Sequence, residues 1–432
     1  MEIGLTFFFL FVVVYALFAS PLNRWLISMP IFFVVAGALL GDAIPQFSTN
    51  LPGARLFTEI TLALLLFADA STLSYRKVTE DRQLPNRLLL FGLLLSIAIG
   101  GVVAFTLFPE KGIWFALLLA SVLAPTDAAL GLPIFNNPKV PVRIRRALNV
   151  ESGLNDGIAT PFVMLFLALA LARPGESVDP FLMPAITEIG IAVIVAIVVG
   201  VIGGKLFALS EKRKWSSLST QEMGALGLAL AAYAGSIALG GNGFIAAFIA
   251  GLLFGRMNQH AESIVEFTEI SGTTLSIFVW AMFGATVVSP LLRGFDIRAL
   301  LFAILSLTLV RMLSVGIAMI GTGLRRDTVA LMGWFGPRGL ASVVFTLITL
   351  ETFQGMSQST EALIAAASWT ILLSVVLHGV SAQPLANWYA RRLESAPEDI
   401  PEMWDEPEVV LRRSHPVNSM KRSSINNASQ AE

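Results

Sequence analysis

The stretch NVESGLNDG, residues 149–157, places two carboxylates, Glu151 and Asp156, directly before a long apolar run. That run, IATPFVMLFLALALA at 158–172, contains no charged residue and is long enough to cross most of a bilayer as a helix. A charged side chain at membrane depth costs roughly 2.5–3.5 kcal/mol on insertion scales, so each acid requires a partner or a function. This segment therefore constrains both the fold and the chemistry of the chain.

The composition is that of a membrane protein. Of the 432 residues, 55% are hydrophobic and 14% are charged, whereas a soluble domain carries about 25% charged residues. Apolar segments of about 20 residues, the length of a membrane-spanning helix, recur along the chain, and the strict alternation of β-barrel strands is absent. We predict an all-α polytopic membrane protein with about 13 transmembrane helices.

The chain divides into a membrane domain, residues 1–385, and a polar, Pro-containing tail, residues 386–432, which we expect to be cytoplasmic and largely disordered. Lys and Arg residues concentrate in alternate connections between the apolar segments. Because cytoplasmic loops carry the excess of positive charge, this pattern predicts an N-terminus outside and a C-terminus in the cytoplasm.

Two apolar segments carry a Pro beside a charged residue and flanking Gly. They are LAPTDAALGLP (123–133) in the fifth span and GWFGPRGLASV (333–343) in the twelfth. An offset of seven spans means opposite directions through the membrane, which is typical of inverted repeats with two discontinuous helices. We predict repeats at about 1–172 and 222–385, joined by a linker helix at 183–209. Coincidence is the alternative, since Pro and Gly are common in membrane helices.

Four polar residues form one patch on the helix of the opening segment. At about 100° per residue, Glu151, Ser152, Asn155 and Asp156 lie on one continuous face. A desolvated acid needs a counter-charge, and Arg311 and Arg338 are the embedded cations available for Glu151, with Arg311 favoured.

Asp156 is then the acid left to titrate. A buried carboxylate is neutral unless a cation compensates it, so a proton and a hard cation compete for it. Oxygen ligands for that cation are expected from Asp156, Ser152, Asp127 and the Thr126 backbone carbonyl, and Asn155 and Thr126 are expected to bridge the two helices by hydrogen bonds. This competition, with access alternating between the two sides of the membrane, predicts cation/proton exchange.

The segments APTDAALG (124–131), NVESGLNDG (149–157) and FGPRGLASVVF (335–345) resemble the signature segments of bacterial NhaP-type sodium/proton antiporters, of the monovalent cation/proton antiporter-1 family. The resemblance extends over about residues 1–385. It implies that Asp156 binds the ion and the proton, that Ser152, Asp127 and Thr126 contribute to the cation site, and that Glu151 joins a structural acid–Arg pair.

The resemblance also implies that Arg338 lies on the second broken helix, and that the protein is a homodimer with a mobile six-helix core that moves in an elevator-like way. The neighbouring Asn155 and Asp156 imply electroneutral one-for-one exchange. The chain departs from the pattern at Gly157, where many members have Pro.

Our prediction is therefore an electroneutral sodium (lithium)/proton antiporter of a bacterial plasma membrane, acting in pH homeostasis, with no cofactor beyond the transported ions. A potassium/proton antiporter is the alternative, and a cation channel is a more remote one because no repeated filter is visible. Neither a P-loop nor an HExxH motif occurs, which argues against ATP-driven pumping and a zinc enzyme. The net charge of −1 offers no basic surface for nucleic acid. The three His residues, His260, His378 and His415, are interpreted as interfacial or solvated.

Overall fold

The computed structural model of the chain describes residues 2–25, 27–44, 54–72, 83–127, 129–135, 137–171, 179–258, 260–288, 291, 294–353, 357–394, 397 and 400–404. These residues form helices and connecting segments, with no strand among them, so the all-helical prediction is confirmed. Among them, seven helices are long and apolar enough to cross a membrane, and three shorter apolar helices accompany them. The chain is a multi-pass membrane protein.

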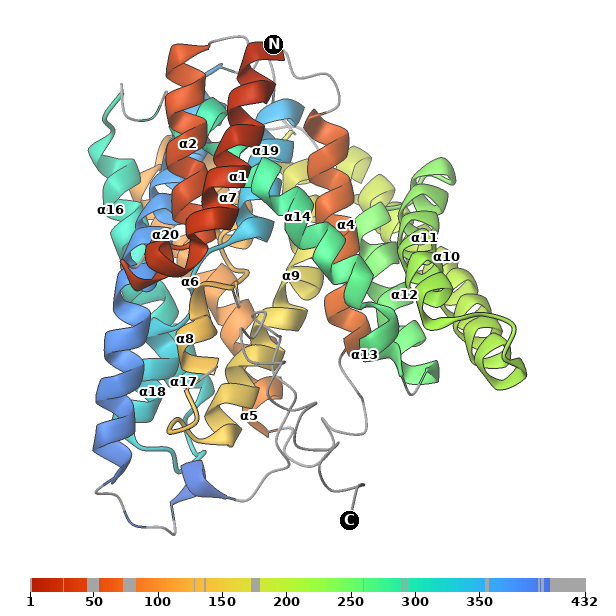
Figure 1. Ribbon diagram of the computed structural model, residues 1–432. Helices are drawn as coiled ribbons and strands as arrows, with labels where there is room; N and C mark the ends of the chain where they lie inside the picture. The colour runs from red at the N-terminus through yellow and green to blue at the C-terminus, as the bar shows by residue number, and fades with distance from the viewer. Residues whose placement is uncertain are drawn as a thin grey trace.

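One group of helices is connected to α4, directly or through α12 and α14, and is called the α4 bundle here (Figure 1). Its members are α1 (Glu2–Arg24), α2 (Met29–Ala43), α4 (Ala54–Thr72), α10 (Asp179–Arg213), α11 (Leu218–Ala238), α12 (Gly243–Met257), α13 (Ala261–Ile264) and α14 (Glu266–Phe283), which continues as the π-helical η5 (Gly284–Val288). A Cβ added at Gly251 or Gly255 of α12 would meet the backbone of Phe67 or Ser71 of α4. Small residues thus allow these helices the close approach on which membrane-helix packing depends.

The second group is connected to α9, directly or through helices such as α7 and α19, and is called the α9 bundle. It comprises α5 (Gln83–Asn86), η2 (Arg87–Gly92), α6 (Leu93–Leu107), η3 (Pro109–Lys111), α7 (Gly112–Val122), η4 (Ala129–Gly131), α8 (Leu132–Phe135), α9 (Val142–Ala170), α16 (Ile297–Leu305), η6 (Ser306–Val310), α17 (Arg311–Ala318), α18 (Arg326–Trp334), α19 (Leu340–Thr352), α20 (Ser357–Glu394) and η7 (Pro401–Met403). Helix α9 also contacts α4, α10 and α12, so it lies where the two bundles meet.

Two helical paths of the α9 bundle are interrupted. The first ends at Val122 with α7 and resumes as η4 and α8, and the second ends at Trp334 with α18 and resumes at Leu340 with α19. Pro125 and Pro337 lie in the interruptions. Because proline has no backbone N–H and excludes the preceding turn, it opens the helix at these points. The interruptions fall in the two Pro-containing segments that the sequence singles out.

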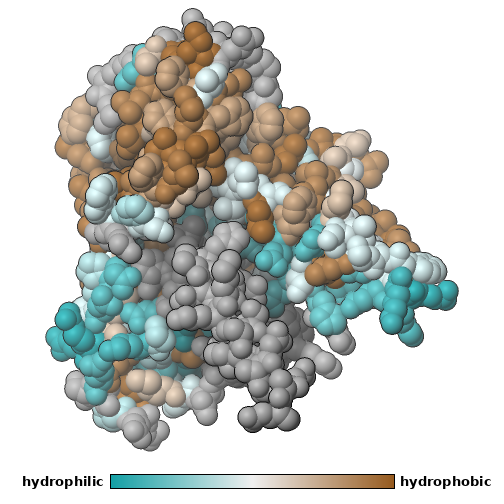
Figure 2. Space-filling view, in the orientation of Figure 1, coloured by the Kyte–Doolittle hydropathy of each residue, from teal (hydrophilic) through white to brown (hydrophobic). Residues whose placement is uncertain are grey.

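The surface is divided between apolar and polar regions. Hydrophobic residues cover the upper part of the molecule in Figure 2, and hydrophilic residues gather at its lower edge. Exposed apolar side chains of α1 include Phe7, Phe9, Leu17 and Phe18. An apolar surface of this kind is suited to lipid rather than water.

The chain beyond residue 385 is partly built into the fold, although the sequence predicts a tail from 386. Helix α20 runs to Glu394, and the Tyr389 and Leu393 side chains are buried. Further on, Glu402 is 1% exposed and accepts hydrogen bonds through Oε1 from the Arg325 amide and the Thr328 hydroxyl, both at 2.7 Å. Apolar contacts continue α20 past the point where its sequence turns polar. Residues 405–432 of the predicted tail lie outside the described residues.

Candidate ion-binding site

The site is organised by α9, which carries all four residues of the polar patch. Glu151, Ser152 and Asn155 are buried, whereas Asp156 is half-buried. The Thr160 hydroxyl, one turn further on, donates to the Asp156 backbone carbonyl at 2.8 Å. Asp156 is therefore less enclosed than its three neighbours, although its Oδ1 atom is buried.

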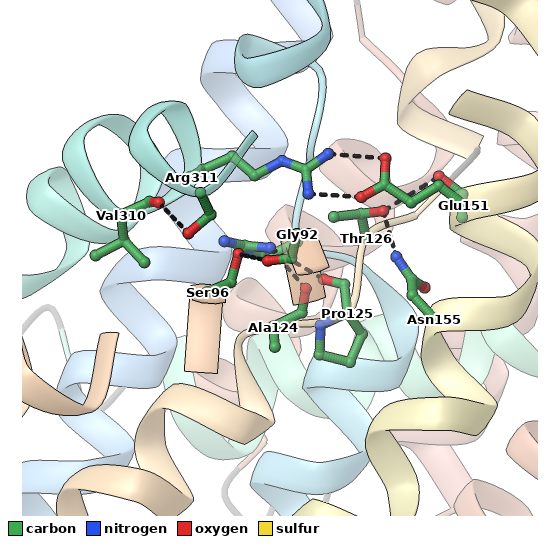
Figure 3. A network of polar contacts seen from close by, with 12 residues as sticks. Gly92, Ser96, Ala124, Pro125, Thr126, Glu151, Asn155, Val310 and Arg311 are labelled. Atoms are coloured by element: carbon green, nitrogen blue, oxygen red, sulfur yellow. Dashed lines mark hydrogen bonds and ion pairs between the residues drawn. The ribbon is translucent and has the colours of Figure 1, made fainter. Parts of the chain in front are cut away.

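Glu151 forms a two-point ion pair with Arg311 of α17 (Figure 3). The distances are 2.6 Å from Nη1 to Oε1 and 2.9 Å from Nη2 to Oε2, and the two side chains are 3% and 2% exposed. A Cβ added at Gly336 would collide with the Arg311 guanidinium, so that glycine leaves room for it. Bidentate charge-assisted bonds are the strong form of this contact. Glu151 is thus a neutralised acid that joins α9 to α17.

One turn away, three neutral groups join α9 to the first interruption. The Asn155 amide donates to Thr126 Oγ1 at 2.5 Å, and Thr126 Oγ1 lies 3.2 Å from Ser152 Oγ. Because Thr126 Oγ1 accepts from Asn155, its own hydrogen is available for Ser152. Asn155 Oδ1 is buried and has no hydrogen-bond partner among the described residues. The cluster therefore holds oxygen acceptors in a buried place next to Asp156.

The two interruptions cross and satisfy each other's helix ends. The Asp127 amide donates to the Pro337 carbonyl at 2.8 Å, and Asp127 Oδ2 accepts from the Leu340 amide, the first of α19, at 3.1 Å. A carboxylate at a helix N-terminus complements the exposed amides and the positive end of the macrodipole.

The C-terminus of α7 is met by a cation, in contrast to the acid at the N-terminus of α19. Arg338 Nη1 donates to the Ala124 carbonyl at 2.9 Å and lies 3.4 Å from the Pro125 carbonyl, just beyond the C-terminus of α7. The Ser342 hydroxyl donates to the Val122 carbonyl at 2.8 Å. A cation therefore sits just beyond the C-terminus of α7, where it complements the negative end of the helix macrodipole. Of the two arginines considered for Glu151, Arg311 makes the ion pair and Arg338 caps α7.

The prediction that His378 is interfacial or solvated is wrong. Its side chain is 1% exposed, inside the α9 bundle, and not interfacial or solvated. Its ring packs against Trp334, with centroids 5.2 Å apart. The signal for it was available, because Ser374, His378 and Ser381 recur at helical spacing. His260, by contrast, is exposed and 2.7 Å from Glu211 Oε1, and His415 lies outside the described residues.

A fold with two crossing interrupted helices, and a buried ion pair and polar cluster on the helix beside them, defines a class of helical membrane transporters. The family model described as "Sodium/hydrogen exchanger, transmembrane" matches residues 7–388. The chain belongs to this family of cation/proton antiporters, which are transporters rather than enzymes. The resemblance to NhaP-type antiporters is thereby confirmed.

Individual relatives include both sodium and potassium antiporters. The "Probable Na(+)/H(+) antiporter 2" of Methanocaldococcus jannaschii is 26% identical over 365 residues, covering 77% of this chain and 84% of that protein. The "Na(+)/H(+) antiporter" of Schizosaccharomyces pombe is 26% identical over 320 residues, 66% of this chain and 67% of that protein. The "K(+)/H(+) antiporter NhaP" of Alkalimonas amylolytica is 24% identical over 380 residues, 85% of this chain and 63% of that protein.

The fold is also that of a solved structure. The sodium proton antiporter MjNhaP1 from Methanocaldococcus jannaschii at pH 8 matches with a TM-score of 0.72 and 21% identity, covering 90% of this chain and 99% of that one. This likeness extends the family assignment to the arrangement of the helices.

Proposed function

We propose that the protein exchanges one Na⁺ or Li⁺ for one H⁺ and that Asp156 binds them in turn. The observation that carries the proposal is the contrast along α9. Arg311 neutralises Glu151 at 2.6 and 2.9 Å, while Asp156 follows the neutral Asn155 and is half-buried. Asp127, the other carboxylate near the site, accepts a hydrogen bond from the Leu340 amide at the N-terminus of α19. With Asp156 as the carboxylate that titrates, a cation and a proton compete for the same charge, and the exchange is electroneutral.

The cation is held by oxygen atoms. Hard monovalent cations prefer oxygen ligands, which Asp156, Ser152, Asp127 and the carbonyl of Thr126 supply around the first interruption. Opening the helix at Pro125 frees backbone carbonyls for this purpose. The Asn155–Thr126 hydrogen bond, at 2.5 Å, fixes the interruption against α9. In this proposal the interruption supplies ligands and α9 supplies the titrating acid.

The proposed architecture has thirteen spans in two inverted six-helix repeats, with the N-terminus outside and the C-terminus in the cytoplasm. The reciprocal capping of the two interruptions, Asp127 on α19 and Arg338 on α7, supports an inverted pair of broken helices. We propose that the α9 bundle moves against the α4 bundle to alternate access, in a homodimer embedded in the plasma membrane.

Potassium is the second candidate ion. A relative covering 85% of this chain is named a K(+)/H(+) antiporter, and K⁺ accepts the same oxygen ligands as Na⁺ and Li⁺. Selectivity among them depends on the size of the cavity and the number of ligands. The choice of ion is therefore the first thing to measure.

The test is proton movement in liposomes. Purified protein is reconstituted with an acidic interior and a pH-sensitive dye, and Na⁺, Li⁺ or K⁺ is added outside in turn. We expect alkalinisation of the lumen with Na⁺ and Li⁺ that is unchanged when the membrane potential is clamped. A response to K⁺ alone would establish the potassium exchanger, a voltage-sensitive response would reject electroneutrality, and no response from folded protein would reject the proposed function.

A further inference from the structure

One face of α20 forms hydrogen bonds with the second interruption, between α18 and α19. Ser374, His378 and Ser381 lie on this face, and each contacts a residue of α18 or of the segment after it. The Trp334 indole donates to Ser381 Oγ at 2.9 Å, and the Arg338 amide donates to Ser374 Oγ at 2.6 Å. None of these three residues is assigned a role in the proposed exchange.

His378 occupies the centre of this face. Its Nε2 lies 2.8 Å from the carbonyl of Trp334, the last residue of α18, and its Nδ1 lies 3.2 Å from Ser374 Oγ. The Ser374 carbonyl also lies 2.9 Å from Nδ1. Nε2 faces only an acceptor, the Trp334 carbonyl, whereas Nδ1 has a hydroxyl beside it that can donate, so the proton is assigned to Nε2. A neutral ring with its proton on Nε2 therefore donates to Trp334 and accepts the Ser374 hydroxyl hydrogen, and this network is the basis of the tautomer assignment.

The hydrogen bonds continue from His378 to the neighbourhood of the ion. Ser374 Oγ, which donates to His378, accepts the Arg338 amide, and the Arg338 guanidinium donates to the Ala124 carbonyl at 2.9 Å. Ala124 is two residues from Thr126, whose hydroxyl contacts Ser152 and Asn155. The path from α20 to the first interruption therefore consists of directed contacts between buried groups.

We propose that His378 is a positioning residue for the cation site: through the Trp334 carbonyl and Ser374 it sets the backbone at Arg338, and Arg338 sets the carbonyl end of α7 beside Thr126. The inference rests on the proposed exchange. It adds a residue that touches neither ion, and it predicts that losing the His378 hydrogen bonds weakens cation binding without removing the titrating acid.

The test compares three variants. His378→Leu removes both hydrogen bonds, His378→Gln keeps a donor and an acceptor, and His260→Gln is the control at the exposed histidine. Exchange is measured in liposomes over a range of Na⁺ concentrations and normalised to folded protein. We expect His378→Leu to raise the apparent KM for Na⁺ roughly tenfold, as expected for an unsatisfied buried group, with a smaller change in maximal rate. His378→Gln should recover most of the loss, and His260→Gln should match the wild type.

A merely structural role gives a different result. If His378→Leu lowers only the yield or the maximal rate, or if Gln and Leu shift KM equally, the inference is overturned. Ser374→Ala cuts the same path at the Arg338 amide and serves if His378→Leu does not fold; an unchanged KM there would also overturn it. The Na⁺ concentration that half-maximally raises the melting temperature in detergent reports binding without transport. It separates a failure of this inference from a failure of the proposed exchange.

Discussion

The two acids of α9 lie little more than one helical turn apart in contrasting surroundings. Glu151 is 3% exposed and is held by two bonds to Arg311, whereas Asp156 is half-buried and adjoins the neutral cluster of Asn155, Ser152 and Thr126. A buried charge with its partner in place holds two helices together. In the proposed exchange, the less enclosed carboxylate of Asp156 binds a cation and a proton in turn. The same chemical group therefore makes a structural contact at one turn and, in our proposal, carries out the exchange at the next.

The largest expected effect comes from Asp156→Asn. Because the amide neither binds a proton nor carries the charge that a cation requires, we expect cation-driven proton movement in liposomes to disappear. The elution volume and the melting temperature of the variant should stay close to those of the wild type. Asp296→Asn is the control, since Asp296 caps α16 by accepting from the Arg298 amide and Asn caps helices equally well. Full exchange by folded Asp156→Asn protein would contradict the proposal that Asp156 is the acid that binds the ion and the proton.

Glu151→Gln tests the other side of the comparison. It leaves Arg311 buried without its counter-charge, and breaking a buried pair in this way costs about 3–5 kcal/mol of stability. Thermal unfolding in detergent measures the loss. The matched control is Glu394→Gln, because Glu394 pairs with Lys139 at 2.9 Å with both side chains exposed, and such pairs contribute about 0–1 kcal/mol. Equal losses in the two variants would contradict a structural role for the Glu151 pair.

Thr126→Val sharpens the description of the cluster. Valine keeps the shape but leaves the Asn155 amide without its 2.5 Å acceptor, a loss of about 1–3 kcal/mol. We expect the apparent KM for Na⁺ to rise roughly tenfold, while Thr126→Ser, which retains a hydroxyl, stays near the wild type. Exchange rates at several Na⁺ concentrations give the apparent KM of each variant. Identical kinetics for the Val and Ser variants would show that the Thr126 hydroxyl does not contribute to cation binding.

The smallest effect is expected at Gly157, the position after Asp156. A Cβ there would run into the ring of Phe248 on α12. Overpacking of this kind costs about 1–3 kcal/mol, and the helix propensity of Ala returns about 1 kcal/mol. We expect Gly157→Ala to lower the melting temperature slightly and Phe248→Leu in the same chain to restore it. A melting temperature that falls further in the double variant would show that Phe248 is not the obstacle.

The departure at Gly157 therefore has a local explanation in the contact between α9 and α12. The residue is small because an aromatic ring of the other bundle occupies the space that a side chain would need. This contact couples the segment that carries Asp156 to the α4 bundle. No pattern within α9 itself contains that information, since Phe248 is far away along the chain.

Much of the candidate site could be predicted from local sequence. The cost of charge in an apolar helix singled out Glu151 and Asp156, and helical periodicity placed Ser152 and Asn155 on the same face. The breaks at Pro125 and Pro337 were predictable because proline disrupts helices in any surroundings. These properties depend on residues within one or two turns of each other.

The sequence by itself determined the class of fold, the helix that carries the acids and the positions of the two interruptions. Only the tertiary structure decided which arginine meets Glu151, that Asp127 and Arg338 cap opposite helix ends, and that His378 is buried at the second interruption. The physical reason is the distance along the chain over which each property is determined. Burial cost and helix periodicity are local along the chain, whereas counter-charges and hydrogen-bond partners come from segments that meet only when the helices pack.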